Sequence, residues 1–247
     1  MFVNRKYKII TNLLRIYKRC PVLRERRGLL NRYLPLDEFK EKTFLELLRD
    51  IDIKVYKTRG TNPRAEISRF ACDVNAGQFS EEEIARWLLN YNQQWMPPEE
   101  FALRLERNIY GNEAVPYLLL KYSEQLRGRA YSLEDFKKLV SLDLTVEHVL
   151  SREPNFDVRA YGFESEEDYL EHRDRLGNLT LLPKPLNSLA RNKAPLDKAD
   201  YYDREETSLL EITRVLATNI KSRGRFSKED LIDRTKDIAS FVKSFVS

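Results

Sequence analysis

The sequence has few of the features that mark secreted, linker-rich or membrane proteins. Its two cysteines, Cys20 and Cys72, are isolated and form no CxxC pair, so we expect neither a disulfide framework nor a structural zinc site. Only 8 glycines and 10 prolines occur in 247 residues, which argues against long flexible linkers. No apolar run approaches the roughly 20 residues of a membrane span, and no apolar signal core follows the first residues. These absences predict a cytoplasmic protein with no membrane contact.

The charge is nearly balanced overall but is unevenly distributed. The formal net charge is +4, yet ten Lys and Arg residues stand against one acid, Glu25, between Arg5 and Arg32. Such a stretch could contact phosphates, or it could be a solvated helix face paired with acids elsewhere. The composition is otherwise ordinary, and the length suffices for one full core or two small ones.

The first 140 residues are predicted to be helical, because their apolar residues recur at helical spacing. Ser80 followed by Glu83, and Ser132 followed by Asp135, are typical of helix N-termini that are closed by a capping box. One short run, Ile51 to Tyr56, could be a strand or a helix end. No internal repeat occurs.

The pattern changes at Leu142. Apolar and polar residues alternate to His148, which predicts a strand, and 178–182 is a second short strand before two prolines. A helix over 187–193 and two terminal helices follow. We predict a mainly α protein, α+β overall, with a small inserted ββα-metal (HNH) motif. The predicted regions are a helical part (1–140), the ββα-metal core (141–206) and C-terminal helices packing on it (207–247).

Residues at the ends of these elements suit phosphodiester hydrolysis. A neutral imidazole at His148 can take a proton from water near neutral pH. A hard cation, Mg²⁺ or Mn²⁺, needs only one or two protein oxygens, which Asn187 and Glu147 can supply. Asn178 can hydrogen-bond the backbone of the loop between the strands and so fix the pose of His148. Glu147 and His148 point to opposite faces of a regular strand, so Glu147 reaches that site only if the strand ends or twists there.

Other polar residues near this segment divide into phosphate contacts and packing residues. Arg191 follows Asn187 by four positions and is expected on the same helix face, where it could hold a phosphate. Asn192 and Lys193 come next and are further candidates. His172 is interpreted as a solvated helix residue, and the two tryptophans as core and rim packing.

These motifs closely resemble the C-terminal domain of GmrSD-type restriction endonucleases, an HNH-bearing family that also occurs in SspE-like phage-defence proteins. The family pattern is an acid–His pair, GNLTLL, an Asn, a second Asn and a Lys. It corresponds here to Glu147-His148, 177–182, Asn187, Asn192 and Lys198. The resemblance covers roughly 40–247. It implies that His148 is the base, that Glu147 and Asn187 bind the metal, and that Asn178 positions the loop; Lys198 joins the expected nucleic-acid contacts.

The resemblance implies a divalent-metal-dependent DNA endonuclease that acts in restriction or phage defence. Many such proteins carry a nucleotide-using domain upstream, but this sequence has neither a DGQQR-like motif nor a GxxxxGK[ST] loop. A separate or upstream nucleotide-using subunit is therefore an expected partner besides DNA. Two alternatives stay open: a catalytically degenerate module that binds DNA or docks a partner, and a nuclease of the same chemistry directed at RNA.

Overall fold

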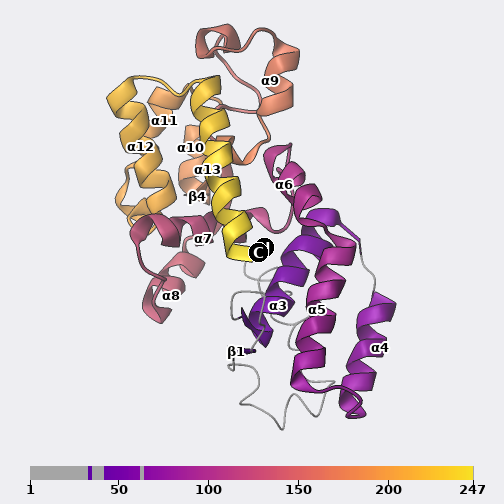
Figure 1. Cartoon of the computed structure of the whole chain (residues 1–247). Helices are drawn as coiled ribbons and strands as arrows, with labels where there is room; N and C mark the ends of the chain where they lie inside the picture. Colours follow the sequence, from indigo (N-terminus) through magenta and orange to yellow (C-terminus); the bar gives the residue numbers. More distant parts are fainter. Residues whose placement is uncertain (1–32, 35–41, 62–63, 247) are drawn as a thin grey trace. The chain divides into compact units, whose positions relative to one another are not determined.

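A computed structural model (Figure 1) describes residues 33–34, 42–61 and 64–246. The described residues are mainly helical, with two small antiparallel two-stranded sheets, and the fold is thus of the predicted α+β class. The basic stretch between Arg5 and Arg32 and the helices expected there lie outside the described residues. The chain divides into two compact units between Phe101 and Ala102. The sequence pattern changes later, near 142, and the predicted three-region division stays a prediction.

The first unit is built from helices and a short hairpin. Thr43 and Ser80 each close a capping box with the glutamate three residues later, as the sequence predicts for Ser80. The Phe70 ring stacks on Trp87 at 3.7 Å between centroids, so the half-buried Trp87 packs at the rim of the unit, within the expected core and rim packing. Its elements are β1 (Tyr33–Leu34), β2 (Lys42–Thr43), α3 (Phe44–Ile51), the π-helix η2 (Asp52–Arg59), α4 (Arg64–Asn75) and α5 (Glu81–Trp95). Helix α6 (Pro98–Glu106) spans the division.

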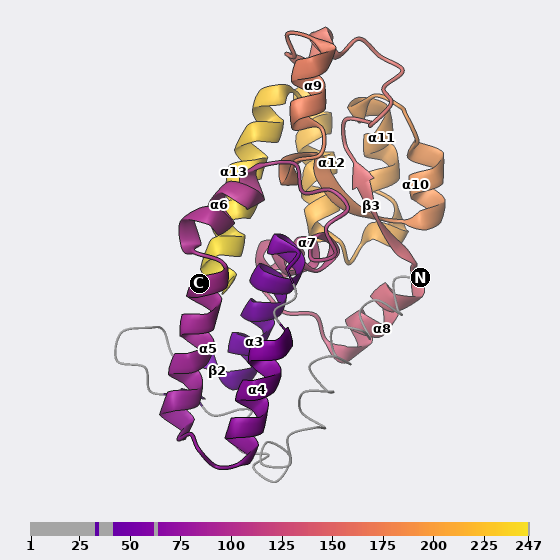
Figure 2. The same ribbon diagram turned by 90° about the vertical axis from the view of Figure 1, so that its right-hand side faces the viewer.

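The second unit surrounds one antiparallel strand pair. β3 (Leu144–His148) pairs with β4 (Leu179–Pro183), with Leu144 opposite Pro183 and His148 opposite Leu179. Figure 2 shows β3 beside α10 and α11, with the following loop leading up to α9. The helices are α7 (Val115–Arg127), α8 (Leu133–Ser141), α9 (Glu166–His172), α10 (Lys184–Ala190), α11 (Pro195–Tyr202), α12 (Glu211–Arg223) and α13 (Lys228–Val246); short 3-10 turns are η3 (Val158–Tyr161), η4 (Leu176–Asn178) and η5 (Glu205–Thr207).

Buried contacts fix β4 from two sides. Every residue of β4 is buried. The Thr213 hydroxyl on α12 lies 2.9 Å from the Thr180 hydroxyl and donates to the Leu181 carbonyl at 2.6 Å. Helix α13 presses against the turn before the strand, because a Cβ added at Gly177 would lie 1.9 Å from the Leu231 carbonyl oxygen. Only glycine therefore fits this close approach.

Two local predictions differ from the structure. Asn178 belongs to η4, and β4 begins one residue later, at Leu179. Helix α10 begins at Lys184 and ends at Ala190, so the predicted helix over 187–193 is wrong in register. The reason is that Pro185 fits the first turn of a helix, whose amide groups need no partner. Among the described residues, no helix is long and apolar enough to cross a membrane.

Candidate active site at the end of β3

His148 closes β3 and is held by a carboxylate. Its Nε2 lies 2.9 Å from Asp174 Oδ1, and only 8% of the side chain is exposed. A carboxylate is an acceptor only, so Nε2 carries the proton and donates it to Asp174. Nδ1 then keeps its lone pair, and it has no hydrogen-bond partner among the residues that the structure describes. The imidazole is therefore held in one tautomer with one basic nitrogen available.

Asp174 follows α9 and is fixed through its backbone. Its carbonyl oxygen accepts hydrogen bonds from the amides of Ile109 (2.9 Å) and Tyr110 (3.1 Å). The Tyr110 ring meets the His148 ring edge-on, with 4.3 Å between centroids. Asp174 lies 26 positions from His148 and is not among the residues predicted for the site; its only local signal is a carboxylate between Arg173 and Arg175.

The surroundings of His148 keep its imidazole neutral. Burial lowers the pKa of His148 to about 4; Asp174 opposes this shift, and the nearby charges of Arg152 and Lys198 add to it. An imidazole with this pKa is unprotonated at neutral pH, as a general base must be. Its low basicity also means that it accepts a proton less readily than a solvent-exposed histidine.

Glu147 lies on the opposite face of β3 and forms a buried ion pair. Lys198 Nζ lies 2.7 Å from Glu147 Oε1 and 2.6 Å from the His148 carbonyl oxygen, and the Tyr202 hydroxyl lies 3.2 Å from the same carboxylate oxygen. Burial raises the pKa of Glu147 and lowers that of Lys198, while each charge opposes the shift of the other. Lys198 is 1% exposed, so its ammonium faces this pair and not a surface that nucleic acid could reach.

This arrangement does not fit a metal ion bound by Glu147. The Glu147 carboxylate is buried and already meets a cation and a hydroxyl. Within the described ranges, no group of three or more His, Cys, Asp or Glu side chains could hold an ion. Asn187 fits better, because its side chain is partly exposed and its Oδ1 accepts no hydrogen bond from the described residues. A single amide oxygen is a suitable but incomplete ligand set for a hydrated Mg²⁺.

Asn178 connects the segments on both sides of the site. It is fully buried. Its Oδ1 accepts from the Leu150 amide (2.7 Å), and its Nδ2 donates to the carbonyls of Leu150 (2.8 Å) and Arg173 (2.7 Å). One carboxamide thus ties the chain just after His148 to the chain just before Asp174.

Asn187 lies inside α10 and contacts an earlier part of β3. Its Nδ2 donates to Thr145 Oγ1 (2.9 Å) and to the Val146 carbonyl (3.4 Å). Thr145 shares the face of β3 that Glu147 occupies, whereas His148 is on the other face. The structure therefore places Asn187 on the side of Glu147, and it gives Asn187 no contact with His148.

The three candidate phosphate contacts after Asn187 lie beyond the helix. Arg191 is the C-cap of α10 with a φ of 42°. The prediction that it shares a helix face with Asn187 is therefore wrong. Arg191 and Asn192 are exposed. The Lys193 ammonium lies 4.4 Å from the centroid of the Tyr201 ring. The Ser151 hydroxyl contacts the carbonyls of Arg191 (3.1 Å) and Lys193 (3.3 Å), which places this turn beside the segment after β3.

His172 differs from its predicted solvated state. It is buried near the end of α9, and its Nδ1 lies 2.7 Å from the Asp168 carbonyl oxygen. Its ring also meets Phe163 edge-on, at 6.1 Å between centroids. It is a packing residue, and no hydrogen bond joins it to the His148–Asp174 pair.

Comparison with known proteins identifies a family. The profile of the C-terminal domain of GmrSD restriction endonucleases matches residues 98–241, which is more than half of the chain and includes both strands and the His148–Asp174 pair. No curated protein and no solved structure gave a match. The chain belongs to the family of the C-terminal domain of GmrSD restriction endonucleases.

Proposed function

We propose that this chain is a DNA endonuclease in which His148 is the general base. The observation that carries the proposal is the His148–Asp174 pair, with 2.9 Å between Nε2 and Oδ1. The family supports the reaction class, since it is the C-terminal domain of restriction endonucleases. A histidine held in one tautomer by a carboxylate is a recurring arrangement for removing a proton from a nucleophile.

In this proposal, Nδ1 of His148 takes a proton from water as the water oxygen attacks the phosphorus of a phosphodiester. The P–O bond to the leaving sugar oxygen then breaks, and that oxygen acquires a proton from solvent. Asp174 stabilises the imidazolium that forms and keeps its orientation. Burial makes this stabilisation stronger than it would be in water.

A divalent cation, Mg²⁺ or Mn²⁺, is part of the proposal. It would supply charge neutralisation at the phosphate, which the reaction needs. Asn187 offers an amide oxygen for it on the face of β3 opposite the His148 imidazole, and Glu147 is paired with Lys198 in this arrangement. We assign no reaction step to the cation. Action in phage defence, a cytoplasmic setting and cooperation with a separate nucleotide-using subunit are further parts of the proposal.

A second candidate function is a degenerate domain that binds DNA or a partner without cutting. The buried Glu147–Lys198 pair favours it, because the expected acidic ligand is withdrawn from solvent. Cleavage of RNA instead of DNA is a third possibility with the same site chemistry. Substrate comparison separates these three functions.

The test is cleavage of supercoiled plasmid by the purified full chain with Mg²⁺, with Mn²⁺ or with EDTA. A single-stranded RNA is tested as a second substrate under the same conditions. The expected result is open-circular or linear DNA from the wild-type protein with metal, and none with EDTA or from His148→Ala. Equal products from His148→Ala would remove His148 from the mechanism. Salt-dependent DNA binding without cutting would support the degenerate domain, and cutting of RNA alone would support the third function.

A further inference from the structure

The carboxylate that holds His148 is also approached by two arginines. Arg152 Nε lies 3.4 Å from Asp174 Oδ1, and Arg173 Nε lies 3.6 Å from Asp174 Oδ2. With His148 neutral, these two cations and one carboxylate leave one net positive charge beside the proposed base. A positive site at a partly exposed position attracts the phosphates of nucleic acid.

The Arg152 guanidinium beside Asp174 has hydrogen-bond donors that can bind a ligand. Its side chain is 48% exposed. No hydrogen bond is found from its guanidinium to the described residues, although this group carries five N–H donors in a planar fork that matches a phosphate. Arg173, in contrast, is 22% exposed and donates from Nη1 to the Arg152 carbonyl at 3.0 Å. Arg173 therefore supports the backbone of Arg152, and Arg152 is the group that can meet a ligand.

Tyr110 provides an exposed aromatic surface next to this guanidinium. It is 41% exposed. The Arg152 guanidinium carbon lies 5.1 Å from the centroid of its ring. The same ring borders His148, and the Tyr110 amide is fixed to the Asp174 carbonyl. Exposed aromatic rings beside basic groups are the usual platform for bases of a nucleic acid strand.

We infer that Arg152 and Tyr110 form the strand contact of the active site. Arg152 binds the phosphate that is presented to His148, and Tyr110 stacks on an adjoining base or sugar. This inference rests on the proposed endonuclease function. It places the phosphate contact on the loop after β3 and the segment before α7, whereas the sequence pattern directs attention to the turn at 191–193.

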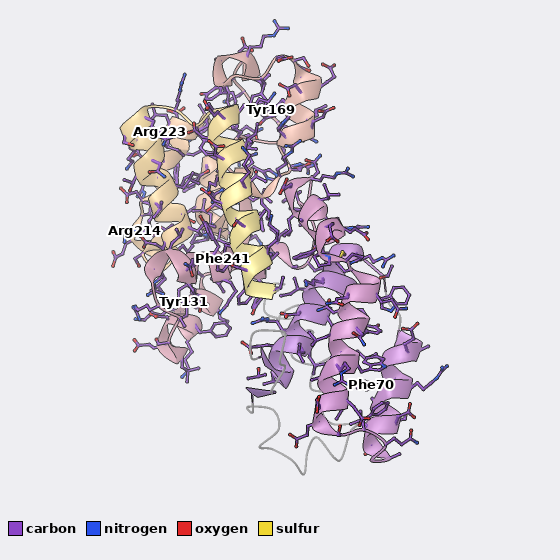
Figure 3. All side chains as sticks on the ribbon, viewed as in Figure 1. Phe70, Tyr131, Tyr169, Arg214, Arg223 and Phe241 are labelled. Carbon is purple, nitrogen blue, oxygen red and sulfur yellow. The ribbon has the colours of Figure 1, made fainter. Side chains whose placement is uncertain are left out.

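The test is DNA binding by full-length protein in which His148→Ala prevents cleavage. A fluorescein-labelled duplex is titrated at several salt concentrations with Arg152→Ala, Tyr110→Ala and Tyr110→Phe variants. The matched control is Arg214→Ala, because Arg214 is an exposed arginine of α12 that lies away from α9 (Figure 3). Thermal melting of each variant verifies folding.

We expect Arg152→Ala to weaken binding about tenfold and to reduce the salt slope by about one phosphate contact. Tyr110→Ala is expected to weaken binding about tenfold through lost stacking, and Tyr110→Phe to leave it unchanged. If Arg152→Ala has the same affinity and salt slope as Arg214→Ala, the inference is wrong. The proposed function still stands in that case, provided that the wild-type protein cleaves plasmid. A wild-type protein that neither binds nor cuts DNA would overturn both.

Discussion

Lys198 and Glu147 form a buried ion pair beneath the active-site strand, with 2.7 Å between Nζ and Oε1. Lys198 also donates to the carbonyl of His148, so the pair fixes the end of β3 from the face opposite the imidazole. A role for Glu147 as a metal ligand requires this pair to open. Since a buried charge without its partner is costly, the pair has a measurable structural effect.

Lys198→Met is predicted to lower the free energy of unfolding by about 3–5 kcal/mol, because it leaves the Glu147 carboxylate buried without a cation. Urea denaturation measures the change. The Glu147→Leu, Lys198→Met double variant should lose less than the single variant, since no unpaired charge remains. Lys184→Met is the control, because Lys184 is exposed and its ion pair with Asp143 is long, with 3.9 Å between Nζ and Oδ2. A loss below about 1 kcal/mol for Lys198→Met would contradict this role.

The stability of the second unit should depend on pH through His148. Its pKa is lowered to about 4 in the folded chain, against about 6.5 unfolded. Between these values the unfolded state binds the proton and the folded state resists it. The free energy of unfolding that depends on neutral His148 is therefore fully present above about pH 6.5. It is lost as the pH falls toward 4, and the total loss is about 3 kcal/mol. Denaturation curves of wild type and His148→Gln, compared from pH 7 to 4, should diverge; parallel curves would refute the shifted pKa.

Asp174→Asn is predicted to reduce the cleavage rate by about 10- to 100-fold, because it removes the charge that stabilises the imidazolium and permits the other tautomer. Single-turnover kinetics at saturating protein separates this effect from binding. Asp233→Asn is a suitable control, since Asp233 is 65% exposed and pairs only with Lys236 within the described chain. Rates within threefold of each other for the two variants would exclude Asp174 as a positioning residue.

Gly177→Ala is predicted to destabilise the fold and to disturb the site. The added Cβ would lie 1.9 Å from the backbone oxygen of Leu231 and 2.7 Å from the Thr235 amide, and neither backbone group can move without shifting α13. We expect a loss of about 1–3 kcal/mol. Gly224→Ala is the comparison, because a Cβ there meets nothing within 4 Å although φ is +70°. Gly177 has no positive φ, so the steric contact with α13 is the reason for its loss. A loss in Gly177→Ala no larger than that in Gly224→Ala would contradict the close approach of α13.

Local signals in the sequence predicted the local structure well. The capping boxes at Ser80 and Ser132 are confirmed, because each depends on residues within one helical turn. The two strands are confirmed within two residues, since an alternating or continuous apolar pattern is enough to define them.

Long-range partners could not be predicted in the same way. Asp174 reaches His148 only because α9 and the turn at Asn178 fold back on the end of β3. No spacing of residues in the sequence predicts this contact. The burial of Lys198, which the resemblance places among the nucleic-acid contacts, has the same origin. Local sequence does not show that α11 brings this lysine against the end of β3. The helix that carries Asn187 begins three residues earlier than predicted, because Pro183 and Pro185 are as typical of a break as of a helix start.

The most direct test of the catalytic base compares the only two histidines of the chain. Single-turnover cleavage of a labelled duplex with Mg²⁺ is measured for wild type, His148→Ala and His172→Ala, with melting curves to verify folding. The account predicts that His148→Ala lowers the rate by about 10²- to 10⁴-fold, while folded His172→Ala stays near the wild-type rate. A His148→Ala protein that cuts within threefold of wild type would contradict it.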